Sequence, residues 1–248
     1  MTTRTIDDVL TEMDAVVDRY RARGHRGGYF AALYRRVTRE VAAWIAADRF
    51  DDGARMERLD VLFADRYLDA VRQREQGRRT SRAWEVAFDA SEDWWPIVLQ
   101  HLLLGMNAHI NLDLGIATAR TAAGGRLVDL RADFLRINEL LASLTDDVQD
   151  RLGDIWPHMR LLDWVGGRGD EGTVHFKIER ARDGAWALAT VLHACPQEAW
   201  DLPIATTDRY VAVLGGKVRH PGPLFGSALR VIRLGERRDV REVMDLLS

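Results

Sequence analysis

One stretch of the chain, residues 97–119, is apolar on every side of a helical wheel. Leucine, isoleucine, methionine and alanine side chains occupy all directions around its axis. A helix with this pattern is normally buried at the centre of its domain, because none of its faces suits contact with water. The stretch therefore predicts a central helix that other helices surround.

The rest of the sequence supplies the surrounding helices. Apolar residues recur at helical spacing, and no proline occurs before residue 96, which allows long helices there. Besides the central helix, we expect helices over 6–23, 29–49, 54–73, 84–88, 128–152, 174–194 and 238–247. Residues 210–214 are predicted as a short strand or a helical turn, and residues 217–225 as a loop. The fold class is therefore all-α: a single bundle-like helical domain over 1–195, with a looser C-terminal extension, 196–248, packed on it.

Five polar residues interrupt the apolar pattern of the central helix: His101, Asn107, His109, Asn111 and Asp113. Each needs a hydrogen-bond partner, because an unpaired buried polar group costs about 1–3 kcal/mol. At about 100° per residue, His101, His109 and Asp113 fall toward one face, and the last two are spaced so that their side chains can meet. Asn107 and Asn111 form a second such pair on the opposite side, suited to hydrogen bonds with neighbouring helices.

The cluster of His101, His109 and Asp113 predicts a buried acid–base site. Asp113 would fix the tautomer of His109, and His101 would supply a second proton carrier. Gly105, one turn from each histidine, is expected to leave a gap that another backbone, a substrate or an ion could enter. Asp60 is the most promising carboxylate from another helix, because apolar residues flank it closely.

Other residues are candidates for contacts around this site. The predicted substrate-binding residues are Asn107, Asn111, Trp94 and Tyr67. Trp94 lies just before the central helix, where an aromatic side chain could form one wall of a pocket. Glu179 and Arg182 are expected to pair with each other along the 174–194 helix.

Composition excludes several classes of protein. The formal net charge is −3 and basic residues are interspersed with acidic ones, which argues against nucleic acid as a partner. Cys195 is the only cysteine, so an intramolecular disulfide cannot form. The sequence shows neither a secretory signal nor a membrane-spanning stretch, and we expect a cytoplasmic protein with no membrane contact. The expected partner is a small-molecule substrate, and the sequence leaves open whether the chain forms a homo-oligomer.

Three segments of the chain resemble a known family. Tyr29–Thr38, Arg58–Ala70 and Gly105–Leu114 are similar to an uncharacterised, mainly actinobacterial family of helical proteins that is catalogued as a domain of unknown function. The resemblance runs from about Tyr29 to about Cys195 and is most specific over Asn107–Leu114. It implies an all-helical domain and brings no activity with it.

We expect an enzyme that acts on a small molecule, through elimination, cyclisation or hydrolysis, in specialised metabolism. His101, His109 and Asp113 would transfer protons, with Asp60 as their partner. The sequence requires no cofactor. One alternative places a divalent metal between His101, His109 and Asp113, as in a hydrolase or an oxygenase. Another is a non-catalytic ligand-binding or scaffold protein whose polar network is structural.

Overall fold

The computed structural model describes residues 4–141, 178–236 and 239–248. Every regular element in these ranges is a helix, which confirms the predicted all-α class. The elements are α1 (Ile6–Arg23), α2 (Gly27–Ala46), α3 (Gly53–Glu75), α4 (Arg82–Glu92), α5 (Val98–Ala108), the π-helical turn η1 (His109–Asp113), α6 (Leu114–Thr121), the 3-10 turn η2 (Leu127–Leu130), a helical stretch over 131–141, α9 (Ile178–His193), the 3-10 turn η3 (Gln197–Ala199), α10 (Asp201–Arg219), α11 (Pro223–Gly235) and α12 (Val240–Leu247). The end of the helix expected over 128–152 and the start of that over 174–194 lie outside the described residues.

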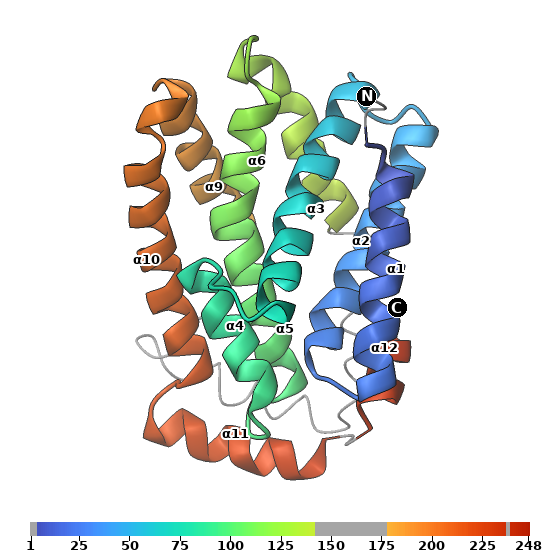
Figure 1. Ribbon diagram of the computed structural model, residues 1–248, viewed down its shortest axis with the longest axis vertical. Helices are drawn as coiled ribbons and strands as arrows, with labels where there is room; N and C mark the ends of the chain where they lie inside the picture. The colour runs from blue at the N-terminus through green and yellow to red at the C-terminus, as the bar shows by residue number, and fades with distance from the viewer. Residues whose placement is uncertain (1–3, 142–177, 237–238) are drawn as a thin grey trace.

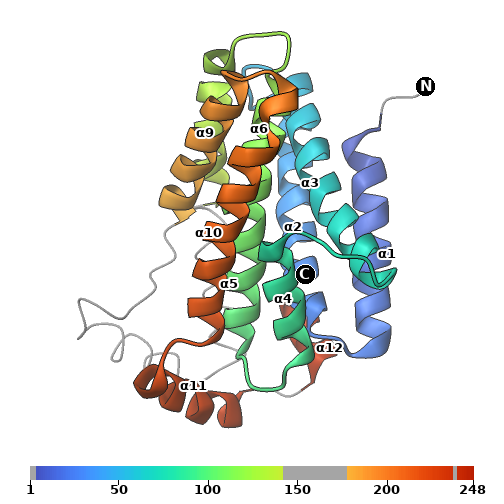
Figure 2. The same cartoon turned by 60° about the vertical axis from the view of Figure 1, so that its left-hand side comes forward.

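The predicted central helix is confirmed as one continuous rod made of α5, η1 and α6. In Figures 1 and 2 this rod runs through the bundle, with α1, α2 and α3 on one side and α9 and α10 on the other. Most of its apolar side chains, among them Leu102, Leu112 and Ile116, are almost completely buried, and the others are half-buried. Among the helices that the structure describes, none combines the length and the apolar character needed to cross a bilayer.

Two glycines of the rod allow its neighbours to come close. A Cβ atom added to Gly105 would lie 2.4 Å from Cγ of Phe30 in α2, so the Phe30 ring fills the gap that the sequence predicted beside this glycine. A Cβ atom on Gly115 would lie 2.8 Å from the carbonyl oxygen of Ala185 in α9. The gap at Gly105 is thus a site of helix packing rather than an opening for a substrate.

Helix α10 packs along α4 and α5 and is tied to the rod by side-chain amides. Gln100 Nε2 donates to the carbonyl oxygen of Val218 at 2.7 Å, and Asn107 Nδ2 donates to that of Val211 at 2.9 Å. Asn111 Nδ2 in turn donates to Asn107 Oδ1 at 3.1 Å. The asparagine pair therefore joins the central helix to a neighbour, as its spacing predicted.

The secondary structure predicted for the residues of α10 was wrong. Residues 201–219 form one helix, where we expected a strand or a turn at 210–214 and a loop from 217 onward. Consecutive glycines, Gly215 and Gly216, normally indicate a break in a helix. Here a Cβ atom on Gly215 would lie 3.2 Å from Asn107 Nδ2, so the small residue serves the close approach of two helices.

The C-terminal helices close one end and one side of the bundle. Helix α11 runs across the ends of the long helices in both views (Figures 1 and 2), and α12 packs on α2. The buried pair Arg233 and Glu236 connects α11 to the start of the rod, because Glu236 Oε1 accepts from the Val98 N–H at 2.9 Å. Arg233 Nε also donates to the carbonyl oxygen of Trp94 at 2.7 Å. Residues beyond 196 thus take part in positioning the central helix.

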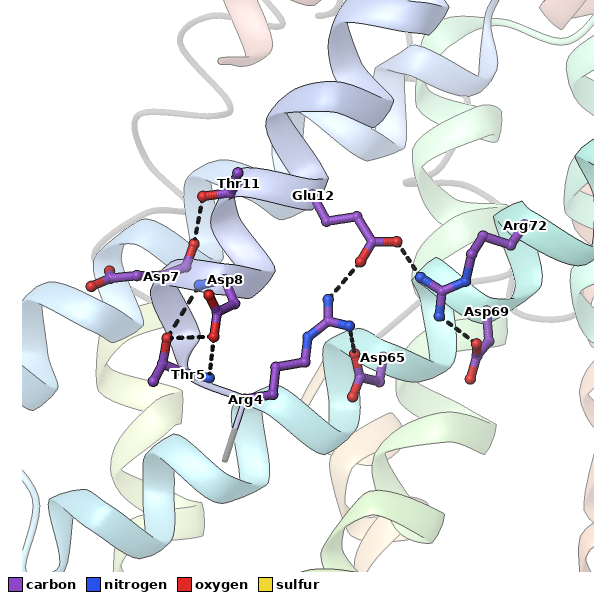
Figure 3. A network of polar contacts seen from close by, with 9 residues as sticks. All are labelled: Arg4, Thr5, Asp7, Asp8, Thr11, Glu12, Asp65, Asp69 and Arg72. Atoms are coloured by element: carbon purple, nitrogen blue, oxygen red, sulfur yellow. Dashed lines mark hydrogen bonds and ion pairs between the residues drawn. The ribbon is translucent and has the colours of Figure 1, made fainter. Parts of the chain in front are cut away.

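A surface network of charges holds α1 against α3 (Figure 3). Arg4 contacts Glu12 at 2.7 Å and Asp65 at 3.1 Å, while Arg72 contacts both Glu12 and Asp69. Ion pairs at a surface contribute little each, about 0–1 kcal/mol, but a network of them also fixes the relative positions of the helices. The network lies away from the rod and its polar residues.

The close packing at Gly105 predicts a specific cost of enlarging this residue. We expect Gly105→Ala to lower the free energy of unfolding by about 1–3 kcal/mol, because the buried Phe30 ring must move. Gly184→Ala in α9 is the matched control: no atom lies within 4 Å of its added Cβ, and the substitution should stabilise the helix by about 0.5–1 kcal/mol. Urea denaturation of both variants measures the difference, and equal effects would contradict the packing described here.

Candidate functional site

The rod changes its helical geometry at the residues that the sequence singled out. Residues His109–Asp113 form a π-helical turn, and the N–H of Leu114 bonds to the carbonyl oxygen of His109, five residues earlier. Such turns are rare and occur frequently at functional sites. The extra residue in this turn also shifts side chains from the 100° spacing that a regular helix would give them.

Asp113 is the most completely hydrogen-bonded side chain of this turn. Its Oδ1 accepts from Arg66 Nε at 2.6 Å, and its Oδ2 accepts from Trp84 Nε1 at 2.8 Å and contacts His109 Nδ1 at 3.3 Å. Burial opposes the charge of Asp113, but the Arg66 guanidinium and the His109 hydrogen bond outweigh it and hold the pKa of this carboxyl below its ordinary value. Asp113 is therefore an ionised carboxylate with 0% exposure.

The carboxylate determines the state of His109. Because Asp113 can only accept, His109 Nδ1 must carry the proton, which leaves the lone pair on Nε2. The imidazole stacks on the Phe63 ring at 3.6 Å between centroids and meets the Tyr34 ring edge-on at 4.3 Å. Burial lowers the pKa of His109 although Asp113 raises it in part, so the ring is neutral near pH 7. Its Nε2 is buried and has no hydrogen-bond partner in the part of the chain that the structure describes.

His109 lines a cavity of about 110 Å³ in the interior of the bundle. The wall is formed by side chains from α2, α3, the rod, the 131–141 helix and α9, and nearly all of them are apolar. The polar side chains among the lining residues are Tyr34, Asp60, His109 and Arg182. A small apolar cavity with a few converging polar groups is the usual form of a site for a small ligand.

Asp60 brings a second titratable group to this cavity. It is 8% exposed, and its Oδ2 is buried with no hydrogen-bond partner in residues 4–141, 178–236 or 239–248. Burial, helped by the negative charge of Glu57, raises the pKa of Asp60 to about 7. Tyr34 beside it stays protonated, because burial and then the charge of Asp60 raise the pKa of its hydroxyl well above the ordinary value. A perturbed carboxyl group in a cavity is a common feature of functional sites.

His101 does not line the His109 cavity. Its ring meets Tyr29 edge-on at 5.6 Å, and it lines a separate space of about 20 Å³ together with Tyr67 and Gly105. Burial and the charges of Arg26 and Arg233 lower the pKa of His101 to about 3. The structure therefore brings His109, Asp113 and Asp60 to one region and separates His101 from them. A catalytic role for His101 stays a prediction.

The predicted substrate-binding residues do not line the His109 cavity. Tyr67 is 2% exposed and packs edge-on against Phe30, and Asn107 and Asn111 face α10 as described above. Trp94 lies at the surface, against Trp95, with Arg233 over its ring. Their assignment as substrate contacts stays a prediction, and the geometry gives them structural partners instead.

The metal alternative does not fit the side chains present. The described residues contain no group of three histidine, cysteine, aspartate or glutamate side chains that could hold a metal ion. His101 is apart from His109, and both Asp113 oxygens already accept strong hydrogen bonds. The expected pair of Glu179 and Arg182 does not form either, because Glu179 is exposed whereas Arg182 turns inward to donate to a backbone carbonyl.

Sequence reasoning missed the donors to Asp113 and the role of Arg182. Arg66 is three residues from the apolar Phe63, so the two are neighbours on the surface of α3, and that position could have indicated it. The buried N–H of Trp84 also needs an acceptor, but spacing alone cannot indicate which one.

Comparison with known proteins places the chain in a family. Residues 6–221 match the Family of unknown function (DUF5995). The match extends beyond Cys195, where the resemblance seen in the sequence ended, and it includes α10. No curated protein and no solved structure matches the chain. Because the match covers most of the chain, the protein belongs to the DUF5995 family.

Proposed function

We propose that the protein is an enzyme that transfers protons on a small, largely apolar molecule held in the His109 cavity. One observation carries the proposal: His109 Nε2 and Asp60 Oδ2 are both buried without hydrogen-bond partners among the described residues, and both side chains line the same cavity. Polar atoms left unpaired in this way cost free energy in the empty protein. A ligand that pairs with them would recover that cost, and the two groups differ in their readiness to give or take a proton.

His109 suits the role of general base. The hydrogen bond to Asp113 holds its ring in the tautomer with a free lone pair on Nε2, and burial keeps that ring neutral. When Nε2 takes a proton, the Asp113 carboxylate stabilises the imidazolium that results. A positioned general base typically contributes about 10²–10⁴-fold to a rate.

Asp60 suits the role of general acid. With a pKa of about 7, it holds its proton at neutral pH far better than an ordinary carboxylic acid does. An efficient acid has a pKa near the working pH. Two titratable groups whose surroundings push their pKa values toward opposite roles are a recurring arrangement in acid–base enzymes.

The cavity favours elimination or cyclisation over hydrolysis. Its walls are almost wholly apolar and its volume is about 110 Å³, which is enough for a small organic molecule but poor for an additional ordered water. The apolar walls also strengthen the interactions of His109 and Asp60 with a ligand, because the local dielectric constant is low.

A second candidate function is the binding of a small apolar ligand without chemistry. The observation in its favour is the full hydrogen bonding of Asp113 by Arg66, Trp84 and His109, since a satisfied buried network also rigidifies a core. Both functions need the same cavity, and they differ in whether the bound molecule changes.

The proposal predicts turnover that depends on His109 and Asp60. A small-molecule extract of the organism that encodes the chain is incubated with purified protein in D₂O and followed by untargeted mass spectrometry. We expect a compound that is converted, or that gains deuterium from the solvent, and we expect His109→Gln and Asp60→Asn each to lower the rate about 10²–10⁴-fold. Exposed His193 provides the control variant His193→Gln, which should keep the wild-type rate.

The two candidate functions give different outcomes in this experiment. A compound that raises the melting temperature of the wild type but keeps its mass, its amount and its hydrogen isotopes would contradict catalysis and favour binding alone. Equal turnover by wild type and His109→Gln would contradict the assigned base.

The raised pKa of Asp60 predicts a pH dependence of stability. The folded protein holds a proton on Asp60 up to about pH 7, whereas the unfolded chain releases it near the ordinary value of 3.8. Folding stability should therefore fall as pH rises from about 4 to about 7 and then level off. A pKa difference of this size corresponds to roughly 4 kcal/mol of folding free energy at most.

Asp60→Asn removes this dependence, because the amide cannot ionise. We expect the melting temperature of this variant, relative to wild type, to increase between pH 5 and about pH 7 and then to level off toward pH 8. Exposed Asp7 provides the control Asp7→Asn, for which the difference from wild type should stay constant over that range. A constant difference for Asp60→Asn as well would show that Asp60 ionises normally, and it would remove this residue as the acid.

A further inference from the structure

Arg182 is a buried cation on the wall of the His109 cavity. It is 5% exposed, its guanidinium lies over the Phe134 ring at 4.3 Å from the centroid, and its Nη2 donates to the carbonyl oxygen of Phe134. Its Nε is buried, and none of the described residues accepts a hydrogen bond from it. Helix α9 positions this side chain, because α9 packs tightly on the rod at Gly115.

No carboxylate in the described ranges forms an ion pair with Arg182. Glu179 on the same helix is exposed. Asp60, which also lines the cavity, forms no ion pair with Arg182. The other arginine near the site, Arg66, forms an ion pair with Asp113. Burial lowers the pKa of Arg182 to about 10, with Asp183 opposing the shift, so the guanidinium is still charged at neutral pH.

We infer that Arg182 binds an anionic group of the ligand, and that the substrates of this cavity are small carboxylates with an apolar body. The inference rests on the proposed function, since it names the substrate class of the same cavity. A buried charge is stable only when it is paired, and a planar guanidinium matches the geometry of a carboxylate. The apolar wall fits a hydrocarbon body, and the unpaired atoms of His109 and Asp60 are left for the reacting part of the molecule.

Binding of matched probes tests the inference without any need for turnover. The cavity is somewhat smaller than one that holds benzene, so short-chain probes are suitable: propanoate and butanoate, with their uncharged amides propanamide and butanamide. Titration by NMR at pH 6, where Asp60 keeps its proton and the acids are still ionised, measures each affinity for wild-type protein. We expect the carboxylates to bind at least tenfold more tightly than the amides, since hydrogen bonds to charged groups are worth about 1.5–3 kcal/mol.

Arg182→Gln should abolish this preference, so that the carboxylates and the amides bind within about twofold of each other. Arg131→Gln is the matched control, because Arg131 also lies over an aromatic ring, that of Trp186, but does not line the cavity. We expect it to keep the wild-type preference. Because the readout is binding and not turnover, the test separates the failure of catalysis from the failure of the inference.

A measurement on the wild type decides the matter even if Arg182→Gln does not fold. Nuclear Overhauser effects from the butanoate methylene next to its carboxylate should reach protons of Arg182 and Phe134. Equal affinity for carboxylates and amides, contacts to other residues, or no binding of any probe would each overturn the inference. In the case of equal affinity, the cavity would still be a binding site, and only its preference for anions would be lost.

Discussion

The buried carboxylate of Asp113 is the interaction on which the rest of the structure depends. A charge with no exposure to water is tolerated only when strong donors surround it. Here they come from three elements: Arg66 from α3, Trp84 from α4 and His109 from the same turn of the rod. Any rotation of the rod relative to α3 and α4 would leave the carboxylate unpaired. The ionised side chain therefore fixes the orientation of the central helix, and with it the position of every side chain that the helix carries.

The same helix separates polar groups that are satisfied from polar groups that are not. Toward α10, the amides of Gln100 and Asn107 bond to backbone carbonyls, and toward α3 and α4 the Asp113 oxygens are fully engaged. Toward the cavity, in contrast, buried atoms of His109 and Asp60 have no partner among the described residues. Other buried polar atoms, such as His101 Nε2, also lack a partner there, but His109 and Asp60 line one cavity between them. Two unpaired titratable groups on the wall of one cavity are the strongest reason to assign a ligand to it.

Much of the fold could be predicted from the sequence, because helical periodicity and burial are local properties. The 6–23 prediction agrees with α1 at both ends, and the rod was correctly placed at the centre. The prediction was wrong around Gly215, where a tertiary contact with Asn107 overrides local propensity. It also placed His101 and His109 toward one face, although eight residues of regular helix put them about 12 Å apart along the axis, and it could not include the Phe30 ring that fills the space beside Gly105. The pairing of His109 with Asp113 was within reach because four residues separate them, whereas the donors Arg66 and Trp84 depend on how distant helices pack.

The charges around the cavity connect the proposed chemistry with the proposed substrate. The pair of Asp113 and Arg66 is neutral as a whole, and His109 is uncharged, so the charge of the cavity depends on Asp60 and Arg182. While Asp60 holds its proton, the cavity carries one positive charge, which an anionic ligand would neutralise. A bound carboxylate would in turn oppose the ionisation of Asp60, since like charges interact strongly in a space of low dielectric constant. The substrate that Arg182 selects would thereby keep Asp60 in the protonated form that a general acid requires.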